Sequence, residues 1–149
     1  MIKEWIRGHY RVSTDPRRLD LDVIHGFLSQ QSYWAEGIPR DVVERSIRNS
    51  LGFGVYDDDR QVGFARVVTD RATFAYLADV FVLEAQRGRG LSKWLLECVL
   101  AHPDLQGLRR WHLTTRDAHG LYAQYGFQPL ADPGTLMEIR RTDAYRQAS

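Results

Sequence analysis

Residues 86–93, with the sequence QRGRGLSK, combine two glycines and three cations in one short segment. The segment joins an apolar run over residues 76–83, which predicts a strand, to an amphipathic run over residues 91–100, which predicts a helix. A helix that begins directly after such a turn presents unpaired backbone N–H groups and a positive potential of roughly half an elementary charge. With three full positive charges added, the segment is predicted to bind a ligand that carries several phosphates.

The glycine spacing excludes two common phosphate-binding motifs. A P-loop requires G-x-x-x-x-G-K-[ST], which the sequence does not contain, and the dinucleotide fingerprint requires a third glycine where Lys93 stands. The remaining pattern, Arg87-x-x-Gly90-x-Ser92, resembles the coenzyme A pyrophosphate loop of the GNAT N-acetyltransferases. That family has Gly or Ala at the last position, and serine is the smallest substitute that still lets a backbone pass close. An exposed basic loop is the alternative interpretation.

A second motif, LYAQYGF at residues 121–127, is similar to the L-Y-x-x-x-G-F segment of the same superfamily. In that segment the first tyrosine faces the thioester sulfur, so the resemblance assigns to Tyr122 the protonation of the leaving thiolate. A phenol with an ordinary pKa of ~10 stays protonated at neutral pH and can donate this proton. Packing in the core is the alternative for Tyr122 and the expected role of Tyr125. Thr115 stands where the family often has an asparagine.

The resemblance also implies how acetyl-CoA, the co-substrate of the family, is held. The central strand of the GNAT fold splays from its neighbour, and its backbone is expected to pair with the pantetheine arm. Backbone amides of the glycine-rich segment are expected to hold the pyrophosphate. The residues implied in cofactor binding are Phe81, Val82, Arg87, Gly88, Arg89, Gly90, Leu91, Ser92 and Lys93. Arg89 and Lys93 are candidates for the adenosine phosphate, with solvated surface charges as the alternative.

Acyl transfer from sulfur to nitrogen needs a group that removes a proton, because an amine is protonated at neutral pH. Asp79 is the first candidate, since it is the one acid in an apolar strand and lies two residues before Phe81. Its alternative is an ion pair with Arg66 of the neighbouring strand or a bond to a backbone amide. His119, one helical turn before Tyr122, is the second candidate, and either group could act through water.

The acceptor is expected to bind at a loop between the first two helices. Tyr33, Trp34 and Glu36 lie there, beside Gly37-Ile38-Pro39, where members of the superfamily often have a substrate-lining loop. Aromatic rings with an acid suit a cationic amine. Anchoring of the loop to the core explains the two aromatic residues equally well. Tyr33, Trp34 and Arg66 are the predicted substrate-binding residues.

Composition restricts the remaining function classes. Lys plus Arg (20) against Asp plus Glu (19) gives a net charge of +1. This charge is too balanced for electrostatic binding to nucleic acid or to an anionic membrane. The lone Cys98 is expected to be a core thiol in a reducing compartment. Five histidines without paired ligand spacing predict no metal site. No signal-peptide pattern follows Met1, so a cytoplasmic protein is expected, and a homodimer is left open.

The order of elements predicts an α/β protein, and it resembles a single GNAT-like domain over residues 1–149. Its mixed, mostly antiparallel central sheet is expected to have helices on both faces. Strands are predicted over residues 10–13, 53–55, 62–68, 75–83 and 111–115, with two short ones within 127–139, and helices over 21–28, 39–47, 91–99 and 117–125.

The leading hypothesis is an acetyl-CoA-dependent N-acetyltransferase that acts on a primary amine of a small molecule by direct transfer in a ternary complex. A second is an enzyme of the same fold that acetylates a protein or an aminoacyl-tRNA. A third is a non-catalytic coenzyme A-binding module, which would keep the loop but lack a productive arrangement of Asp79 and Tyr122.

Overall fold

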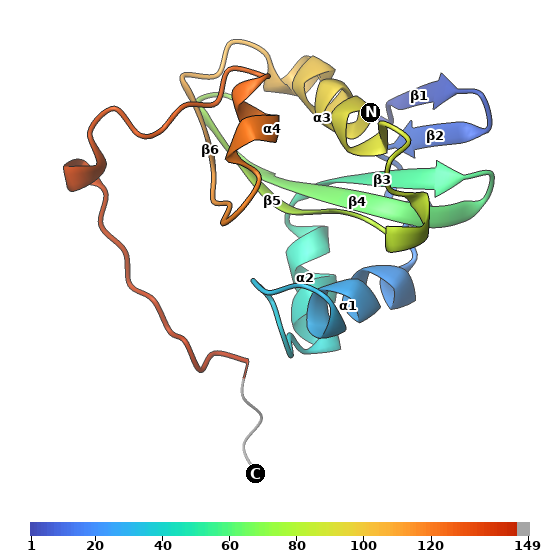
Figure 1. Ribbon diagram of the computed structural model, residues 1–149, viewed down its shortest axis with the longest axis horizontal. Helices are drawn as coiled ribbons and strands as arrows, with labels where there is room; N and C mark the ends of the chain where they lie inside the picture. The colour runs from blue at the N-terminus through green and yellow to red at the C-terminus, as the bar shows by residue number, and fades with distance from the viewer. Residues whose placement is uncertain (146–149) are drawn as a thin grey trace.

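A computed structural model describes residues 1–145 and has six strands in one sheet, in the order β1-β2-β3-β4-β5-β6 (Figure 1). The strands are β1 (Glu4–Arg7), β2 (Tyr10–Ser13), β3 (Leu51–Asp57), β4 (Arg60–Thr69), β5 (Phe74–Val82) and β6 (Arg110–Leu113). Neighbouring strands are antiparallel except β5 and β6, which are parallel. The sheet is therefore mixed and mostly antiparallel, as expected.

Helices cover both faces of this sheet, which confirms the predicted fold class. In Figure 1, α1 (Leu21–Gln30) and α2 (Arg40–Arg48) lie on one face, and α3 (Leu91–Ala101) and α4 (His119–Ala123) on the other. Phe64 and Phe81 pack under α1 and α2, while Phe53 and Val55 pack under α3. Full burial of each such side chain contributes roughly 1.5–3 kcal/mol to stability, so both layers hold the sheet in place.

Local chemistry explains where the first two helices begin. The Asp20 carboxylate accepts hydrogen bonds from the backbone N–H groups of Asp22 (3.0 Å) and Val23 (3.3 Å), which caps α1. Pro39 precedes α2, whose buried face is centred on Val43. The first helix begins at Leu21 as predicted, and the second begins at Arg40, one residue after the predicted start.

Three sequence-based expectations are corrected. Strand β1 was not predicted, because its pattern is weak: only Trp5 of its four residues is partly buried. The helix expected over residues 117–125 is limited to α4 (His119–Ala123). The strand expected over residues 111–115 is β6, which ends at Leu113. The two strands expected within 127–139 are wrong: all of residues 128–145, here called the C-terminal arm, are exposed, and their regular structure is one 3-10 turn at Pro133–Thr135.

No helix among residues 1–145 has both the length and the apolar character needed to cross a lipid bilayer. Cys98 lies buried in α3, as expected, and burial raises the pKa of its thiol to about 12. A buried thiol that stays protonated packs in the core and is a poor nucleophile.

Candidate active site

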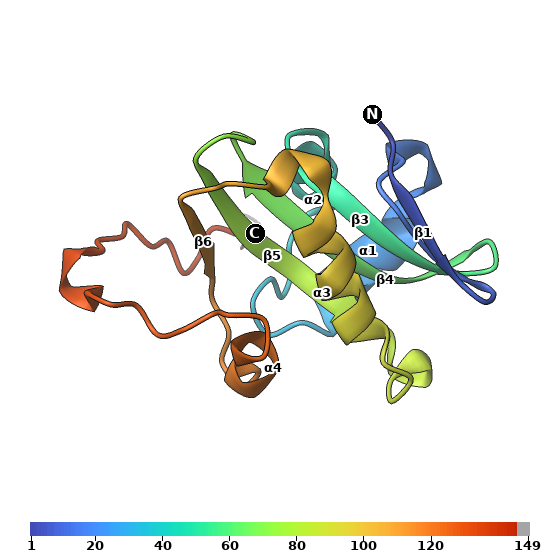
Figure 2. The same ribbon diagram turned by 90° about the horizontal axis from the view of Figure 1, so that it is seen from above.

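Strand β5 pairs with β6 only along its first half. The parallel ladder runs from Phe74 opposite Arg110 to Leu77 opposite Leu113 and then stops. Figure 2 shows the two strands running apart toward α4. Within the described chain, residues 78–82 therefore have no strand partner on the β6 side, and such a free edge can bind an extended ligand. Phe81 and Val82, the residues implied in pantetheine binding, lie on it.

A bulge interrupts β5 at Asp79. On β4, Arg66 is paired with Ala78 and Phe64 with Phe81, so β5 has one residue more than β4 between these pairs. Asp79 adopts φ = 55°, in the left-handed region that few residues other than glycine occupy. A bulge re-aims the side chain that it carries. Here it turns the only acid of β5 toward the loop that joins α1 to α2.

The Asp79 carboxylate is held by two donors. Its Oδ2 accepts a 2.7 Å hydrogen bond from Arg66 Nε, and its Oδ1 accepts a 3.0 Å bond from Trp34 Nε1. Arg66 Nη1 also donates to Ser50 Oγ at 3.1 Å, which fixes the guanidinium. The ion pair with Arg66, offered above as the structural alternative for Asp79, is thus present. Each carboxylate oxygen still has a free lone pair for a further donor.

The glycine-rich segment forms an open groove at the end of β5. Gly88 (φ = 81°) and Gly90 (φ = 77°) take left-handed conformations, and a Cβ added at either would meet nothing within 4 Å. Gly90 precedes α3, and no side chain caps the free N–H groups of that helix. The groove has a volume of about 370 Å³ and is lined by Val82, Gln86, Arg87, Gly88, Gly90, Leu91, Ser92, Lys93 and Leu121. Free amides beside open space fit a pyrophosphate.

The cations of the segment have no acidic partner within residues 1–145. Arg87 Nε donates to the Val82 carbonyl at 3.1 Å, which ties the loop to the end of β5. Arg89 Nη1 donates to Tyr10 Oη at 2.8 Å and to Gln86 Oε1 at 3.0 Å. Lys93 is exposed at the start of α3. Their charges are available to an anionic ligand.

Gln86 is a site residue that the sequence analysis missed. It is buried, and its Nε2 donates to Asp57 Oδ2 at 3.0 Å, while Tyr10 Oη donates to its Oε1 at 2.9 Å. These bonds anchor the glycine-rich loop to β2 and to the end of β3. The only sequence signal was its position directly before Arg87, because a buried glutamine has no distinguishing pattern.

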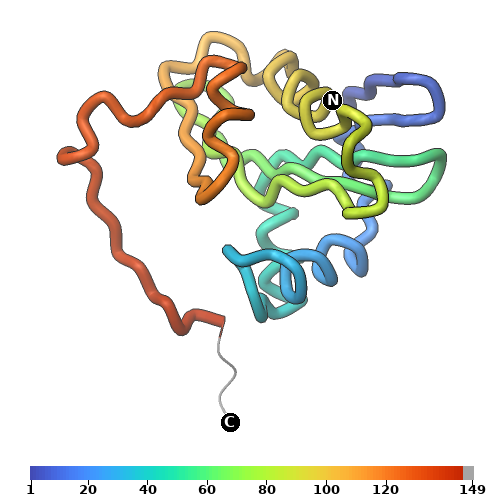
Figure 3. Tube along the Cα trace, in the orientation of Figure 1, coloured from blue at the N-terminus to red at the C-terminus, as the bar shows by residue number. Residues whose placement is uncertain are grey.

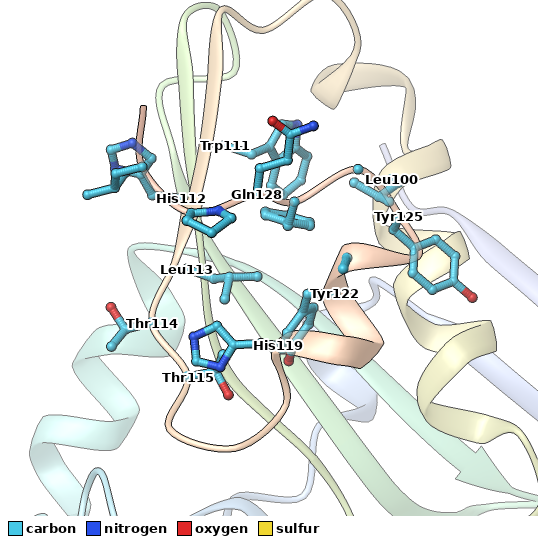
Figure 4. Close-up of a pocket in the computed structure, with 15 residues that line it drawn as sticks. Leu100, Trp111, His112, Leu113, Thr114, Thr115, His119, Tyr122, Tyr125 and Gln128 are labelled. Atoms are coloured by element: carbon cyan, nitrogen blue, oxygen red, sulfur yellow. The ribbon is translucent and has the colours of Figure 1, made fainter. Parts of the chain in front are cut away.

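Tyr122 stands between two cavities. One, of about 670 Å³, is lined by Asp79, Arg66 and Trp34, here called the Asp79 cluster. The other, of about 590 Å³, lies between β6 and α4 (Figure 4). Burial raises the pKa of Tyr122, and the negative charge of the Asp117 carboxylate adds to the shift. The phenol is therefore protonated at neutral pH, as a proton donor must be. Its ring packs edge-on against Phe127 at 5.9 Å.

The structure does not bring the two predicted bases together. His119 is exposed at the start of α4 and lines the 590 Å³ cavity with Tyr122, whereas Asp79 lines the 670 Å³ cavity. Figure 4 shows His119 between Thr115 and Tyr122. Thr115 Oγ1 accepts the Ala118 N–H at 3.1 Å, so it shapes the loop before α4. Of the two candidate bases, only Asp79 shares a cavity with the predicted acceptor loop.

The predicted acceptor loop lines the 670 Å³ cavity through Tyr33 and Trp34 but not through Glu36. The two rings meet edge-on at 5.1 Å and remain 43% and 42% exposed. Arg116, which the sequence analysis missed, stacks its guanidinium 3.8 Å from the centre of the Tyr33 ring, and its backbone N–H donates to Tyr33 Oη at 3.0 Å. The loop is thus attached to the chain that follows β6 while its rings still face the cavity.

Comparisons with known proteins agree with this geometry. The family model described as the acetyltransferase (GNAT) domain matches residues 48–129. A Gibberella zeae protein, provisionally named as an acetyltransferase, is 35% identical over an alignment of 144 residues that covers 82% of this chain and 80% of that protein.

Solved structures give the same result. A crystal structure from Xanthomonas campestris pv. campestris, provisionally described as a GNAT-family acetyltransferase, is 56% identical, with a TM-score of 0.91 over 95% of this chain and 100% of that one. A Clostridium acetobutylicum protein, provisionally described as an acetyltransferase and solved with acetyl-CoA, shares the fold at 14% identity, with a TM-score of 0.59 over 94% of this chain and 96% of that one. Since the family model covers more than half of its length, this chain belongs to the GNAT acetyltransferase family.

Proposed function

We propose that the protein transfers the acetyl group of acetyl-CoA to a primary amine of a small molecule in a single ternary complex. The observation that carries this proposal is the order of three features along β5. The groove of residues 86–93 lies at the end of the strand, residues 78–82 have no strand partner on the β6 side, and Asp79 lines the 670 Å³ cavity. A phosphate-binding loop, a free strand edge and a cavity that contains a carboxylate, in that order, suit a long anionic thioester and a cationic acceptor.

Acetyl-CoA supplies the thioester carbonyl that the amine nitrogen attacks. The groove amides and three cations bind its phosphates, and the free edge of β5 orients the arm that leads to the sulfur. Asp79, which has lone pairs free beside Trp34, binds the ammonium and takes its proton directly or through water. Tyr122, protonated at neutral pH, donates a proton to the thiolate as the carbon–sulfur bond breaks.

Coenzyme A is expected to raise the free energy of unfolding by ~2.7 kcal/mol at a hundredfold excess over its dissociation constant. Gly90→Val should abolish this gain, because its side chain would enter open space in the groove and β-branched residues avoid φ = 77°. Calorimetric titration and thermal melts with acetyl-CoA measure both effects.

Gly107→Val is the matched control. Gly107 also has a positive φ (71°) and open space around its Cβ, but it lies outside the groove. This variant should lose stability to a similar extent and still bind coenzyme A. Absence of any heat of binding or melting shift in the unaltered protein would contradict the proposed function as a whole.

A screen of primary amines with acetyl-CoA, read out by release of free thiol, identifies the acceptor class. Turnover with peptide amines and not with small amines would support the alternative of protein acetylation. Binding of acetyl-CoA without turnover on any amine would support the coenzyme A-binding module.

A further inference from the structure

Arg116 lines the 670 Å³ cavity with a guanidinium that has no acidic partner within residues 1–145. Its Cζ lies 3.8 Å from the centre of the Tyr33 ring, and its backbone N–H donates to Tyr33 Oη at 3.0 Å. Ring and cation therefore hold each other in place. A guanidinium stacked on a ring keeps its in-plane N–H donors free, and this planar fork fits a carboxylate with two parallel hydrogen bonds.

Arg116 and Asp79 lie at the two ends of one aromatic wall of this cavity. Trp34 Nε1 donates to Asp79 Oδ1 at 3.0 Å, and the Trp34 ring meets the Tyr33 ring at 5.1 Å. Arg116 then lies over Tyr33. Figure 3 shows the loop that joins α1 to α2 approaching the turn between β6 and α4, which brings these residues together. The wall thus has a carboxylate at one end, a guanidinium at the other and two rings between them.

The charged side chains that line this cavity balance one another. Three are arginines and three are acids: Arg66, Arg116, Arg140, Asp79, Asp117 and Glu138. Within the described chain, the pair of Arg66 and Asp79 is the only ion pair among them. A polyamine would favour an excess of acids, because each of its charges needs an opposite one. Equal numbers of the two signs suit an acceptor that carries one positive and one negative group.

Given the proposed acetyl transfer, on which this inference rests, we propose that the acceptor is an ω-amino acid, in which several methylene groups separate the amine from a carboxylate. Its ammonium binds at Asp79, and its carboxylate binds the free fork of Arg116. The methylene chain lies across the two partly exposed rings of the wall. An α-amino acid fits less well, because its two charged groups share one carbon, whereas Asp79 and Arg116 are separated by the wall.

Acetylation of such an acceptor leaves its carboxylate unchanged. The nitrogen forms a bond to the acetyl carbonyl carbon, and the carbon–sulfur bond breaks. Two protons leave the ammonium nitrogen: one replaces the proton that Tyr122 gives to the sulfur, and the other passes to solvent through Asp79. The products are coenzyme A and an N-acetylated ω-amino acid, which has lost the positive charge that Asp79 binds.

The test measures kcat/KM for matched pairs of acceptors, with release of free thiol from acetyl-CoA as the readout. Each pair is an ω-amino acid and its primary amide, such as ε-aminocaproate and ε-aminocaproamide, which differ in charge but hardly in size. The acid should be favoured by ~10-fold or more, because the amide loses the charge-assisted bonds to the guanidinium. Along the series glycine, β-alanine, γ-aminobutyrate and ε-aminocaproate, kcat/KM should rise with length.

Arg116→Gln should bring the ratio of kcat/KM between ε-aminocaproate and its amide close to unity. A merely structural role for Arg116 would lower both values and leave their ratio unchanged. Arg116→Lys keeps the charge without the fork, so it should retain part of the preference.

Arg109→Gln is the matched control. Arg109 is exposed, has no ion pair within the part of the chain that the structure describes, and lines none of the three cavities. Its backbone N–H bond to the Thr73 carbonyl at 3.0 Å does not involve the side chain that changes. This variant should keep the preference for the acid.

Four results would overturn the inference: equal kcat/KM for the acid and its amide, a preference that survives in Arg116→Gln, loss of the preference in Arg109→Gln as well, or higher kcat/KM for glycine than for the longer acids. Turnover of neutral amines without any preference for a carboxylate would leave the proposed function standing and remove only the acceptor class. Absence of acetyl-CoA binding, or of turnover with every amine, would instead contradict the proposed enzyme, and the acceptor class with it.

Discussion

Tyr122→Phe is expected to lower turnover by ~10²-fold or more while leaving the affinity for coenzyme A nearly unchanged. The variant removes the hydroxyl that would protonate the leaving thiolate, a contact made chiefly in the transition state, and it keeps the ring that packs against Phe127. Because burial raises the pKa of Tyr122, loss of its proton should limit the unaltered enzyme only at a pH above the ordinary titration range of a phenol. Steady-state kinetics with any active amine, together with calorimetric titration of coenzyme A, measure both quantities.

Tyr125→Phe is the matched control for this prediction. Tyr125 is three residues further along, and its hydroxyl donates to Glu97 Oε1 at 3.2 Å on α3, away from the Asp79 cluster. Turnover of this variant should stay close to that of the unaltered enzyme. Equal losses in the two variants would mean that the segment fails through packing, and full activity of Tyr122→Phe would show that another group protonates the sulfur.

Asp79→Asn is expected to cause a large loss of activity that shrinks as the pH is raised. Asparagine keeps an oxygen for Trp34 but can neither take a proton nor balance the charge of an ammonium. At higher pH more of the amine is already neutral, so the missing carboxylate matters less. The ratio of kcat/KM between the unaltered enzyme and the variant, measured across pH, should therefore fall toward the basic end.

Asp104→Asn tests whether the effect is specific. Asp104 also forms an ion pair with an arginine, Arg71, but it lines neither the 590 Å³ nor the 670 Å³ cavity. This variant should show an unaltered pH profile. A loss in Asp79→Asn that is constant with pH would assign Asp79 a purely structural role as the partner of Arg66.

Much of the fold could be predicted because its strongest patterns are local. Asp20 and Pro39 mark helix starts by chemistry that acts over three residues, and the apolar residues of β4 and β5 reflect burial of these strands beneath the helices on both faces. The prediction of two strands within residues 127–139 was wrong for the opposite reason. The alternating residues do resemble strands, but a strand forms only where another strand pairs with it, and none of the six strands pairs with these residues.

The site was predictable where a short motif defines it and not where distant residues meet. The groove around Gly90 and the position of Tyr122 follow from sequence motifs of fixed spacing. The contacts of Asp79 with Trp34 and Arg66 join residues 45 and 13 positions apart and depend on a bulge that no local pattern signals. The separation of His119 from Asp79 into two cavities likewise depends on where β5 and β6 diverge.

The left-handed backbone at Asp79 also limits how this protein can evolve. For most side chains that conformation costs on the order of 1 kcal/mol or more, and aspartate, asparagine and glycine tolerate it best. Position 79 can therefore exchange a carboxylate for an amide or for no side chain, but bulky or branched residues would reshape β5. New acceptor preferences would have to arise at Tyr33, Trp34 and Arg66, where ordinary backbone geometry leaves the choice of side chain open.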